Sequence, residues 1–530
     1  MMRRSIILVA CPLLILSATA FAKTSNSGKT RPPHAVTVPK PTAVHTRHSV
    51  KVDGRTIHYT ATAGTLILKN KKNQGTASVF YIAYTKNGAH ADHRPVTFAY
   101  NGGPGFASAL VDIGGFGPMR IKWPEPGDSA AAQPPYQLVP NQYSILKTTD
   151  IVFIDAIGTG YSRIVGKGKP KDFYGIKEDG AAFKQFVEQW LTRNHRWNSP
   201  KFLLGESYGT TRNAVLANDL VNDGVYLNGV IMCSTVLQFS TINSVPGNDL
   251  PFISYLPSYA AVAWYHHRLD PRPPSLPKFV HKVEKFAAGP YAHALFEGAA
   301  LSEADKKTIA AKLANYTGLP ESLWLKADLR MTLSVFRRHV MGNDTMTGRY
   351  DERFTTYQLQ PLLPYPGRDN LGATTSAYLG ALTATMNRYL AQSLKYHSDR
   401  PYVQSSDSVF KAWDWKYKTP LSGLLEGVGN SAAFESPNVA PALARAMSND
   451  PGMQLMMNNG YYDTATPFFA TVYTVRHMGL PKPLYKNIHW HYYPVGHMLY
   501  LNPKALPKVD ANIDSFIEHA AREHSNPHRG

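Results

Sequence analysis

Short apolar segments that end near glycine or serine constrain the fold of this chain more than any other feature. Four of them occur at residues 95–103, 150–160, 201–207 and 228–235. Apolar residues recur at helical spacing between the last three, at 177–195 and 210–222. This alternation of strand and helix predicts a largely parallel sheet, with a ligand site at the carboxyl ends of its strands.

The rest of the chain divides around this pattern. Alternating apolar and polar residues over 48–68 and 77–88 predict antiparallel hairpins before it. Helical patterns and proline dominate from about 240 to 445, and strand patterns return near 453–463 and 488–498. We therefore expect an α/β core in two parts, 49–240 and 446–530, separated by a helical insertion or cap over 241–445.

The N-terminus has the organisation of a secretory signal peptide. Arg3 and Arg4 precede an apolar run, and small residues end the segment 1–22, so we expect cleavage before Lys23. Residues 23–48 are rich in Pro, Thr and Lys, which predicts a flexible leader. The apolar run is too short for a stable membrane span. The mature protein is therefore expected to be exported, in the periplasm or outside the cell. A lipid-modified Cys11 is an alternative, because the residues before it resemble a lipoprotein cleavage site.

Charge and cysteine content narrow the class of protein further. The formal net charge is +19 over 530 residues, and the basic residues are scattered along the chain. Such a surface attracts anionic surfaces or acidic substrates, but no recognition motif for nucleic acid accompanies it, so nucleic-acid binding is not expected. Without the signal, Cys233 is the one remaining cysteine, so no intramolecular disulfide can form. Its apolar strand predicts a buried small side chain rather than a nucleophile.

Residues 205–209, GESYG, match the G-x-S-x-G pattern of a nucleophile elbow. A strand pattern precedes the match and a helical pattern follows it, which is the context that this motif requires. The small flanking residues permit a tight turn that holds Ser207 where a base can reach it. The alternative is a glycine-rich strand exit with a surface serine.

A serine hydroxyl needs an imidazole to accept its proton and an acid to fix the tautomer of that imidazole. In the α/β-hydrolase fold they follow in the order Ser, Asp, His. Asp463 and His497 each follow a late strand pattern here. The alternatives are a helix N-cap role for Asp463 and an ordinary loop position for His497.

His489 and His491 could imitate a metal pair with His497, but no cysteine or close carboxylate completes a site, so no metal is expected.

The turn NGGPG at residues 101–105 follows an early strand. Glycine allows close approach of the backbone and exposes its N–H groups, and in this fold the second oxyanion donor comes from the loop after an early strand. We therefore expect the N–H groups of Gly103 and Tyr208 to stabilise a tetrahedral oxyanion. The alternative is a plain strand-to-loop exit.

Several motifs now stand in a characteristic order: NGGPG, a Gly-Pro pair at 117–118, IDAIGTGYS at 154–162, GESYG, an Asp in a G-x-x-D setting at 460–463, and GHM at 496–498. This set resembles the serine carboxypeptidases of peptidase family S10, over roughly 95–240 and 450–505. The resemblance implies an α/β-hydrolase fold with a mostly parallel sheet and a helical insertion. It also implies release of C-terminal residues from peptides through a serine acyl-enzyme, without a cofactor. The residues it implies are the triad Ser207, Asp463 and His497, the oxyanion hole Gly103 and Tyr208, and the carboxylate-binding pair Asn101 and Glu206.

The chain departs from that family at three positions. Ala99 stands where a tryptophan is common, Gly115 where a glutamate is frequent, and Phe106 where a cysteine is usual. The first two departures remove partners from the network that binds the substrate carboxylate. We therefore expect a secreted serine carboxypeptidase acting on peptides, with a serine esterase, an acyl hydrolase or another exopeptidase on the same fold as the first alternative. A non-catalytic binding protein on the same fold is the second, and the sequence carries no signal for an oligomeric state.

Overall fold

The computed structural model describes residues 37–123, 133–342, 344–357, 372–418 and 436–523. The expected signal peptide, Cys11 and the leader up to residue 36 lie outside these ranges. No helix among the described residues is long and apolar enough to cross a membrane.

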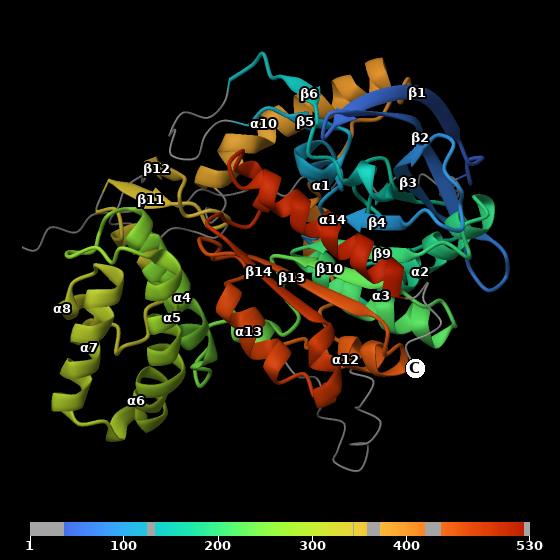
Figure 1. Cartoon of the computed structure of the whole chain (residues 1–530). Coiled ribbons are helices and arrows are strands. Elements are labelled where there is room, and N and C mark those ends of the chain that lie inside the picture. The colour runs from blue at the N-terminus through green and yellow to red at the C-terminus, as the bar shows by residue number, and fades with distance from the viewer. Residues whose placement is uncertain (1–36, 124–132, 343, 358–371, 419–435, 524–530) are drawn as a thin grey trace, which may run out of the picture. The chain divides into compact units, whose positions relative to one another are not determined.

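One large sheet organises the chain (Figure 1). Its strands lie in the order β1 (Ala43–Val52), β2 (Arg55–Lys69), β3 (Gly75–Lys86), β7 (Asp150–Ile154), β4 (Val96–Tyr100), β9 (Lys201–Glu206), β10 (Gly229–Cys233), β13 (Gln454–Gly460) and β14 (Ile488–Tyr493), with the short β8 (Arg163–Ile164) beside β3. The pairs from β1 to β7 are antiparallel, whereas every pair from β7 to β14 is parallel. Both the predicted hairpins and the predicted parallel sheet are therefore present.

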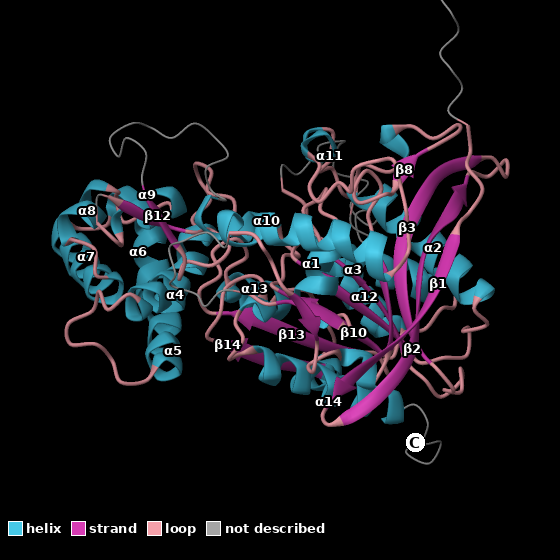
Figure 2. Ribbon diagram, turned by 90° about the horizontal axis from the view of Figure 1, so that it is seen from above, coloured by secondary structure: helices cyan, strands magenta, loops and turns pink. Residues whose placement is uncertain are grey.

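Helices cover both faces of this sheet (Figure 2). Successive strand residues point to opposite faces, so in β9 Phe202 and Leu204 join one core cluster while Leu203 joins the other. The first cluster is completed by α1 (Ala109–Val111), α10 (Gly372–Arg388) and α14 (Leu506–Glu523), and the second by α2 (Ile176–Arg193), α3 (Tyr208–Asn222) and α12 (Ala440–Asn449). The inner parallel strands are buried along their whole length, which explains why they are largely apolar, whereas β14 at the edge of the sheet is mostly half-buried and carries two histidines.

A separate group of helices precedes the second half of the sheet. It comprises α4 (Leu250–Tyr265), α5 (Leu276–Phe286), α6 (Ala292–Glu297), α7 (Glu303–Thr317), α8 (Glu321–Lys326) and α9 (Leu333–His339). These helices share their own apolar core, which includes Trp324 and Phe336 and extends to Phe468 of α13 (Phe468–Arg476). A two-stranded sheet, β11 (Thr345–Thr347) and β12 (Thr355–Tyr357), follows α9.

The structure differs from the sequence prediction in two places. Strand β1 begins at Ala43, inside the segment predicted as leader, and pairs with β2 over its whole length. For most of its length the inner face of this edge strand is only half-buried, so its sequence shows no apolar period. The strand is stabilised by its backbone pairing with β2. The segment 241–445 is also not one body, because α10 and α12 pack on the sheet while α4–α9 form the separate group.

Candidate active site

Ser207 lies in the sharp turn between β9 and α3. Its backbone has φ of +60° and ψ of −129°, a conformation that costs a non-glycine residue about 1–3 kcal/mol. The flanking glycines are required by close packing: a Cβ on Gly205 would lie 2.3 Å from the carbonyl oxygen of Gly209. The Ser207 N–H donates to the carbonyl of Cys233 at 3.0 Å, which ties the turn to β10. The predicted nucleophile elbow is therefore formed.

Asp463 and His497 follow β13 and β14, and they meet at the elbow. His497 Nδ1 lies 2.8 Å from Asp463 Oδ2, and both side chains are buried. Asp463 Oδ1 accepts from the backbone N–H groups of Ala465 and Thr466, so the carboxylate is held by several donors. With its Nδ1 proton donated to this carboxylate, the imidazole keeps the lone pair of Nε2 available as a base.

The alternative roles of these two residues find no support. Helix α13 has Pro467 at its N-cap, not Asp463. His497 is buried and lines a small cavity together with Ser207. His489, the possible metal partner, lies 3.0 Å from Gln454 Oε1, and the described residues contain no group of three His, Cys, Asp or Glu side chains placed to hold a metal ion.

The electrostatic environment of His497 favours its role as a base. Burial lowers the pKa of the imidazole, but the charge of Asp463 and their hydrogen bond, assisted by Glu206, outweigh burial and raise the pKa above its usual value.

Two backbone contacts fix the position of His497: its N–H donates to Tyr350 O, and its carbonyl accepts from Ser234 Oγ, both at 2.6 Å. Thr466 Oγ1 donates to Asp463 Oδ2 at 2.7 Å and lies 3.2 Å from His497 Nδ1. No sequence pattern marked Tyr350, Ser234 or Thr466.

The NGGPG turn packs directly against the elbow. A Cβ on Gly102 would lie 2.4 Å from the backbone nitrogen of Tyr208. Gly103 has a φ of +110°, which only glycine adopts readily, and it lines one cavity with Ser207 and Tyr208. The two N–H groups expected to form the oxyanion hole therefore belong to segments in contact. The close approach of Gly102, which the sequence analysis did not single out, is what makes this packing possible.

Asn101 and Glu206 form a buried pair below the same turn. Asn101 Nδ2 donates to Glu206 Oε1 at 2.7 Å, and the hydroxyl of Tyr500 donates to the same oxygen at 3.2 Å. Glu206 Oε2 has no hydrogen-bond partner in the described structure. Burial raises the pKa of Glu206 to about 7, although His497 and the hydrogen bonds from Tyr500 and Asn101 act in the opposite direction.

Tyr500 explains the glycine at position 115. A Cβ on Gly115 would lie 2.3 Å from Cγ of Tyr500, so the tyrosine ring occupies the space beside this glycine. The residue that the family frequently has there, a glutamate, could not be accommodated without moving Tyr500. This chain instead supplies Glu206 with a phenol donor from a short 3-10 helix, Leu499–Leu501, that follows β14. Tyr500 was missed because a single aromatic residue after a strand normally indicates only packing.

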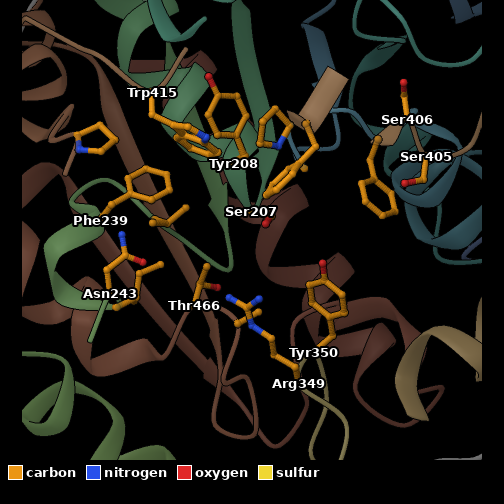
Figure 3. Close-up of a pocket in the computed structure, with 18 of the residues that line it drawn as sticks. Ser207, Tyr208, Phe239, Asn243, Arg349, Tyr350, Ser405, Ser406, Trp415 and Thr466 are labelled. Atoms are coloured by element: carbon orange, nitrogen blue, oxygen red, sulfur yellow. The ribbon is translucent and has the colours of Figure 1, made fainter. Parts of the chain in front are cut away.

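Two cavities meet at the nucleophile. The smaller one is lined by Asn101, Glu206, Tyr378 and His497. The larger one has a volume of about 570 Å³ and apolar walls that include Val236, Phe239, Ile242 and Trp415, with Arg349 reaching into it (Figure 3). Gly103, Phe106, Ser207 and Tyr350 line both cavities. A substrate bound across Ser207 can therefore place one group in each.

Comparison with known proteins finds a family model and several solved structures that resemble this chain. A family model described as serine carboxypeptidase, Peptidase_S10, matches residues 56–236, the part that carries the NGGPG turn and the elbow. No curated protein matches the sequence. Similar solved structures include proline iminopeptidase from Mycobacterium smegmatis, with 13% identity over 87% of this chain and 99% of that one and a TM-score of 0.37. Another is the peroxisomal α/β-hydrolase Lpx1 from Saccharomyces cerevisiae, with 9% identity over 93% of this chain and 91% of that one and a TM-score of 0.35.

The predicted fold is thus present, and it brings the predicted triad side chains into one region. The mostly parallel sheet with helices on both faces, with Ser207, Asp463 and His497 in the segments after β9, β13 and β14, is that of an α/β-hydrolase. The resemblance to the serine carboxypeptidases holds over residues 56–236, and the later strands bring Asp463 and His497 to Ser207. The chain is a serine-type hydrolase.

Proposed function

We propose that this hydrolase is an exported serine carboxypeptidase, which releases C-terminal residues from peptides. The observation that carries the proposal is the buried Glu206 beside the nucleophile, with two donors on Oε1 and none on Oε2. A proton on Oε2 would leave Oε1 free to accept both hydrogen bonds, and it would be available to a second carboxylate. Two bare carboxylates in contact repel each other, so a protonated Glu206 is suited to bind the free carboxylate at the end of a peptide. A simple esterase has no use for such a group.

The reaction follows from the roles of the triad. Ser207 Oγ attacks the last peptide carbonyl while His497 takes its proton, and Asp463 stabilises the imidazolium that forms. The N–H groups of Gly103 and Tyr208 stabilise the oxyanion of the tetrahedral intermediate. His497 then gives its proton to the leaving amine, which departs as the terminal amino acid. Water attacks the acyl-enzyme in the same way, which releases the shortened peptide and restores Ser207.

The proposal predicts a characteristic dependence on pH. Hydrolysis requires neutral His497, so the rate on every substrate rises with pH through the pKa of this group. Recognition of a terminal carboxylate requires protonated Glu206, whose pKa is about 7, so cleavage of free-acid peptides falls again above that pH. Free-acid peptides should therefore give a bell-shaped profile, whereas peptides with an amidated C-terminus should give a plateau.

The direct test uses N-acetylated peptides, each as free acid and as C-terminal amide, with cleavage sites read by mass spectrometry. Successive loss of C-terminal residues from the acids, with weak cleavage of the amides, supports the proposal. Glu206→Gln, which keeps a donor without an ionisable group, should flatten the alkaline limb for the acids. Equal cleavage of acids and amides, with cuts at internal bonds, would indicate a broader serine hydrolase. Hydrolysis of esters alone would indicate the esterase alternative.

Export is the second element of the proposal. It rests on the sequence of residues 1–22, which the structure does not describe. N-terminal sequencing of the protein recovered from the envelope or the medium should begin at Lys23. A lipid-modified N-terminus at Cys11 would place the enzyme on a membrane surface instead, and an intact Met1 in the cytoplasm would contradict export.

A further inference from the structure

Arg349 is a charged residue in the larger cavity that the mechanism does not use. It lies between β11 and β12, and its carbonyl accepts hydrogen bonds from the N–H and hydroxyl of Thr464, next to the catalytic Asp463. Its guanidinium extends into the cavity from the side that carries Tyr350 (Figure 3). No described residue gives this side chain a hydrogen bond or an ion pair, and its Nε is fully buried without a partner.

A buried guanidinium nitrogen without a hydrogen-bond acceptor is unfavourable unless another molecule supplies the acceptor. A guanidinium has five N–H donors, and here the one on Nε is removed from water without an acceptor, which costs free energy, although the side chain as a whole is half-buried. The other charged residue that lines this cavity is Asp407, an exposed side chain in the first turn of α11 (Asp407–Lys411). The polar side chains that also line the cavity, such as Asn243 and Thr466, are uncharged, so none of them is a carboxylate that could pair with the guanidinium. The missing acceptor is therefore one that a bound molecule would bring.

The position of Arg349 indicates which part of a substrate would bring it. Asn101 and Glu206 line the smaller cavity, which receives the terminal residue under the proposed function, whereas Arg349 lines the larger one. Both cavities open at Ser207. The residue whose carbonyl becomes the acyl group therefore projects its side chain toward Arg349. The net charge of +19 favours the approach of acidic peptides in addition.

We propose that Arg349 binds the side-chain carboxylate of the residue immediately before the scissile bond, so that the enzyme prefers substrates with Glu or Asp at that position. This inference rests on the proposed function for its direction, because that function decides which group enters which cavity. The planar guanidinium can bind a carboxylate through two parallel hydrogen bonds, which a lysine cannot reproduce. A charge-assisted contact of this kind corresponds to a preference of about 10- to 100-fold in kcat/KM for Glu over Gln.

The test compares two N-acetylated free-acid peptides that differ only in Glu or Gln before the terminal residue. The wild-type ratio of kcat/KM for the Glu peptide over the Gln peptide should fall to near 1 in Arg349→Met, and Arg349→Lys should keep part of the preference. The ratio is the readout because Arg349 also lowers the pKa of His497, so its loss can change the rates on both peptides together. Arg272→Met is the matched control, because Arg272 stacks on Trp264 in the α4–α9 group and its loss changes the net charge equally. Thermal unfolding verifies that the variants are folded. An unchanged Glu/Gln ratio in Arg349→Met would overturn the inference.

Two further experiments distinguish a side-chain carboxylate from the terminal carboxylate, and failure of this inference from failure of the proposed function. If Arg349 bound the terminal carboxylate instead, Arg349→Met would slow all free-acid peptides alike and spare their amides, which would also overturn the inference. The p-nitrophenyl monoester of glutaric acid and p-nitrophenyl valerate have acyl chains of similar length, with and without a carboxylate. Preference for the glutarate that depends on Arg349 would support acidic recognition on the acyl side even if no peptide lost its C-terminal residue. In that outcome only the proposed carboxypeptidase function would fail.

Discussion

Replacing Tyr500 by Phe removes one hydroxyl, and with it the 3.2 Å hydrogen bond to Glu206 Oε1. The ring that fills the space beside Gly115 stays in place. The hydroxyl donates to the carboxylate and so lowers the pKa of Glu206, against the larger effect of burial. Its loss should therefore raise that pKa above about 7 and keep Glu206 protonated to higher pH.

The size of this change follows from the difference between two hydrogen bonds. A bond to a charged group contributes about 1.5–3 kcal/mol, and one between neutral groups about 0.5–1.5 kcal/mol. The bond therefore favours the ionised form by roughly 1–1.5 kcal/mol, and one pKa unit corresponds to about 1.4 kcal/mol. We expect the alkaline limb for free-acid peptides to move upward by roughly 0.7–1 pH unit.

The assay is kcat/KM from pH 5 to 9 on one peptide as free acid and as amide. Tyr493→Phe is the matched control, because its buried hydroxyl donates to Asn458 at 3.1 Å and has no contact with Glu206. Tyr493→Phe should lower the melting temperature about as much as Tyr500→Phe does, but it should leave the alkaline limb of the pH profile at the wild-type position. An alkaline limb that stays fixed in Tyr500→Phe, or that moves equally for acid and amide, would refute the link between Tyr500, Glu206 and carboxylate binding.

Four other substitutions test the triad, the oxyanion hole and a buried ion pair between α2 and α3. Ser207→Ala should lower kcat/KM by about four to six orders of magnitude without loss of fold, and near-normal turnover would remove Ser207 from the triad. Asp463→Asn should lower kcat/KM by about 10³–10⁴, also without loss of fold, and a loss under about tenfold would remove Asp463 from the triad. Gly103→Val places a Cβ 2.7 Å from the Gly105 nitrogen at a residue with a φ of +110°. The substitution should displace the N–H group of the oxyanion hole and lower kcat by about 10²–10³. An effect on KM alone would indicate that the turn binds substrate instead. Arg212→Met leaves the buried carboxylate of Asp179 without its partner and should cost about 3–5 kcal/mol in urea unfolding, whereas a cost below about 1 kcal/mol would show that this pair is not structural.

The sequence allowed the sheet and the triad to be predicted because both leave local patterns. Strands buried on both faces read as apolar runs, and the elbow needs small residues at fixed offsets from Ser207. Asp463 and His497 follow from chain order once the elbow is recognised. The start of β1 could not be predicted, because an edge strand with a half-buried face needs no apolar period.

The groups that adjust the site left no such pattern. Tyr500 and Arg349 reach the cavities through tertiary packing, and neither lies in a motif. The division of 241–445 also escaped prediction, because an amphipathic helix shows that one face is buried but not which surface buries it. Thus α10 covers the sheet while α4–α9 pack mainly on one another.

The parallel pairing of β10 with β13 has a consequence for how this enzyme comes into being. These two neighbours in the sheet are separated in the chain by all of α4–α12, so their contact is among the most non-local in the fold. Non-local contacts form late, since a long loop must close before they contribute any stability. During synthesis the N-terminal portion emerges and can fold first. A nascent chain therefore holds Ser207 without its base until β14 has been made and has docked, and hydrolysis can begin only after His497 has reached the elbow.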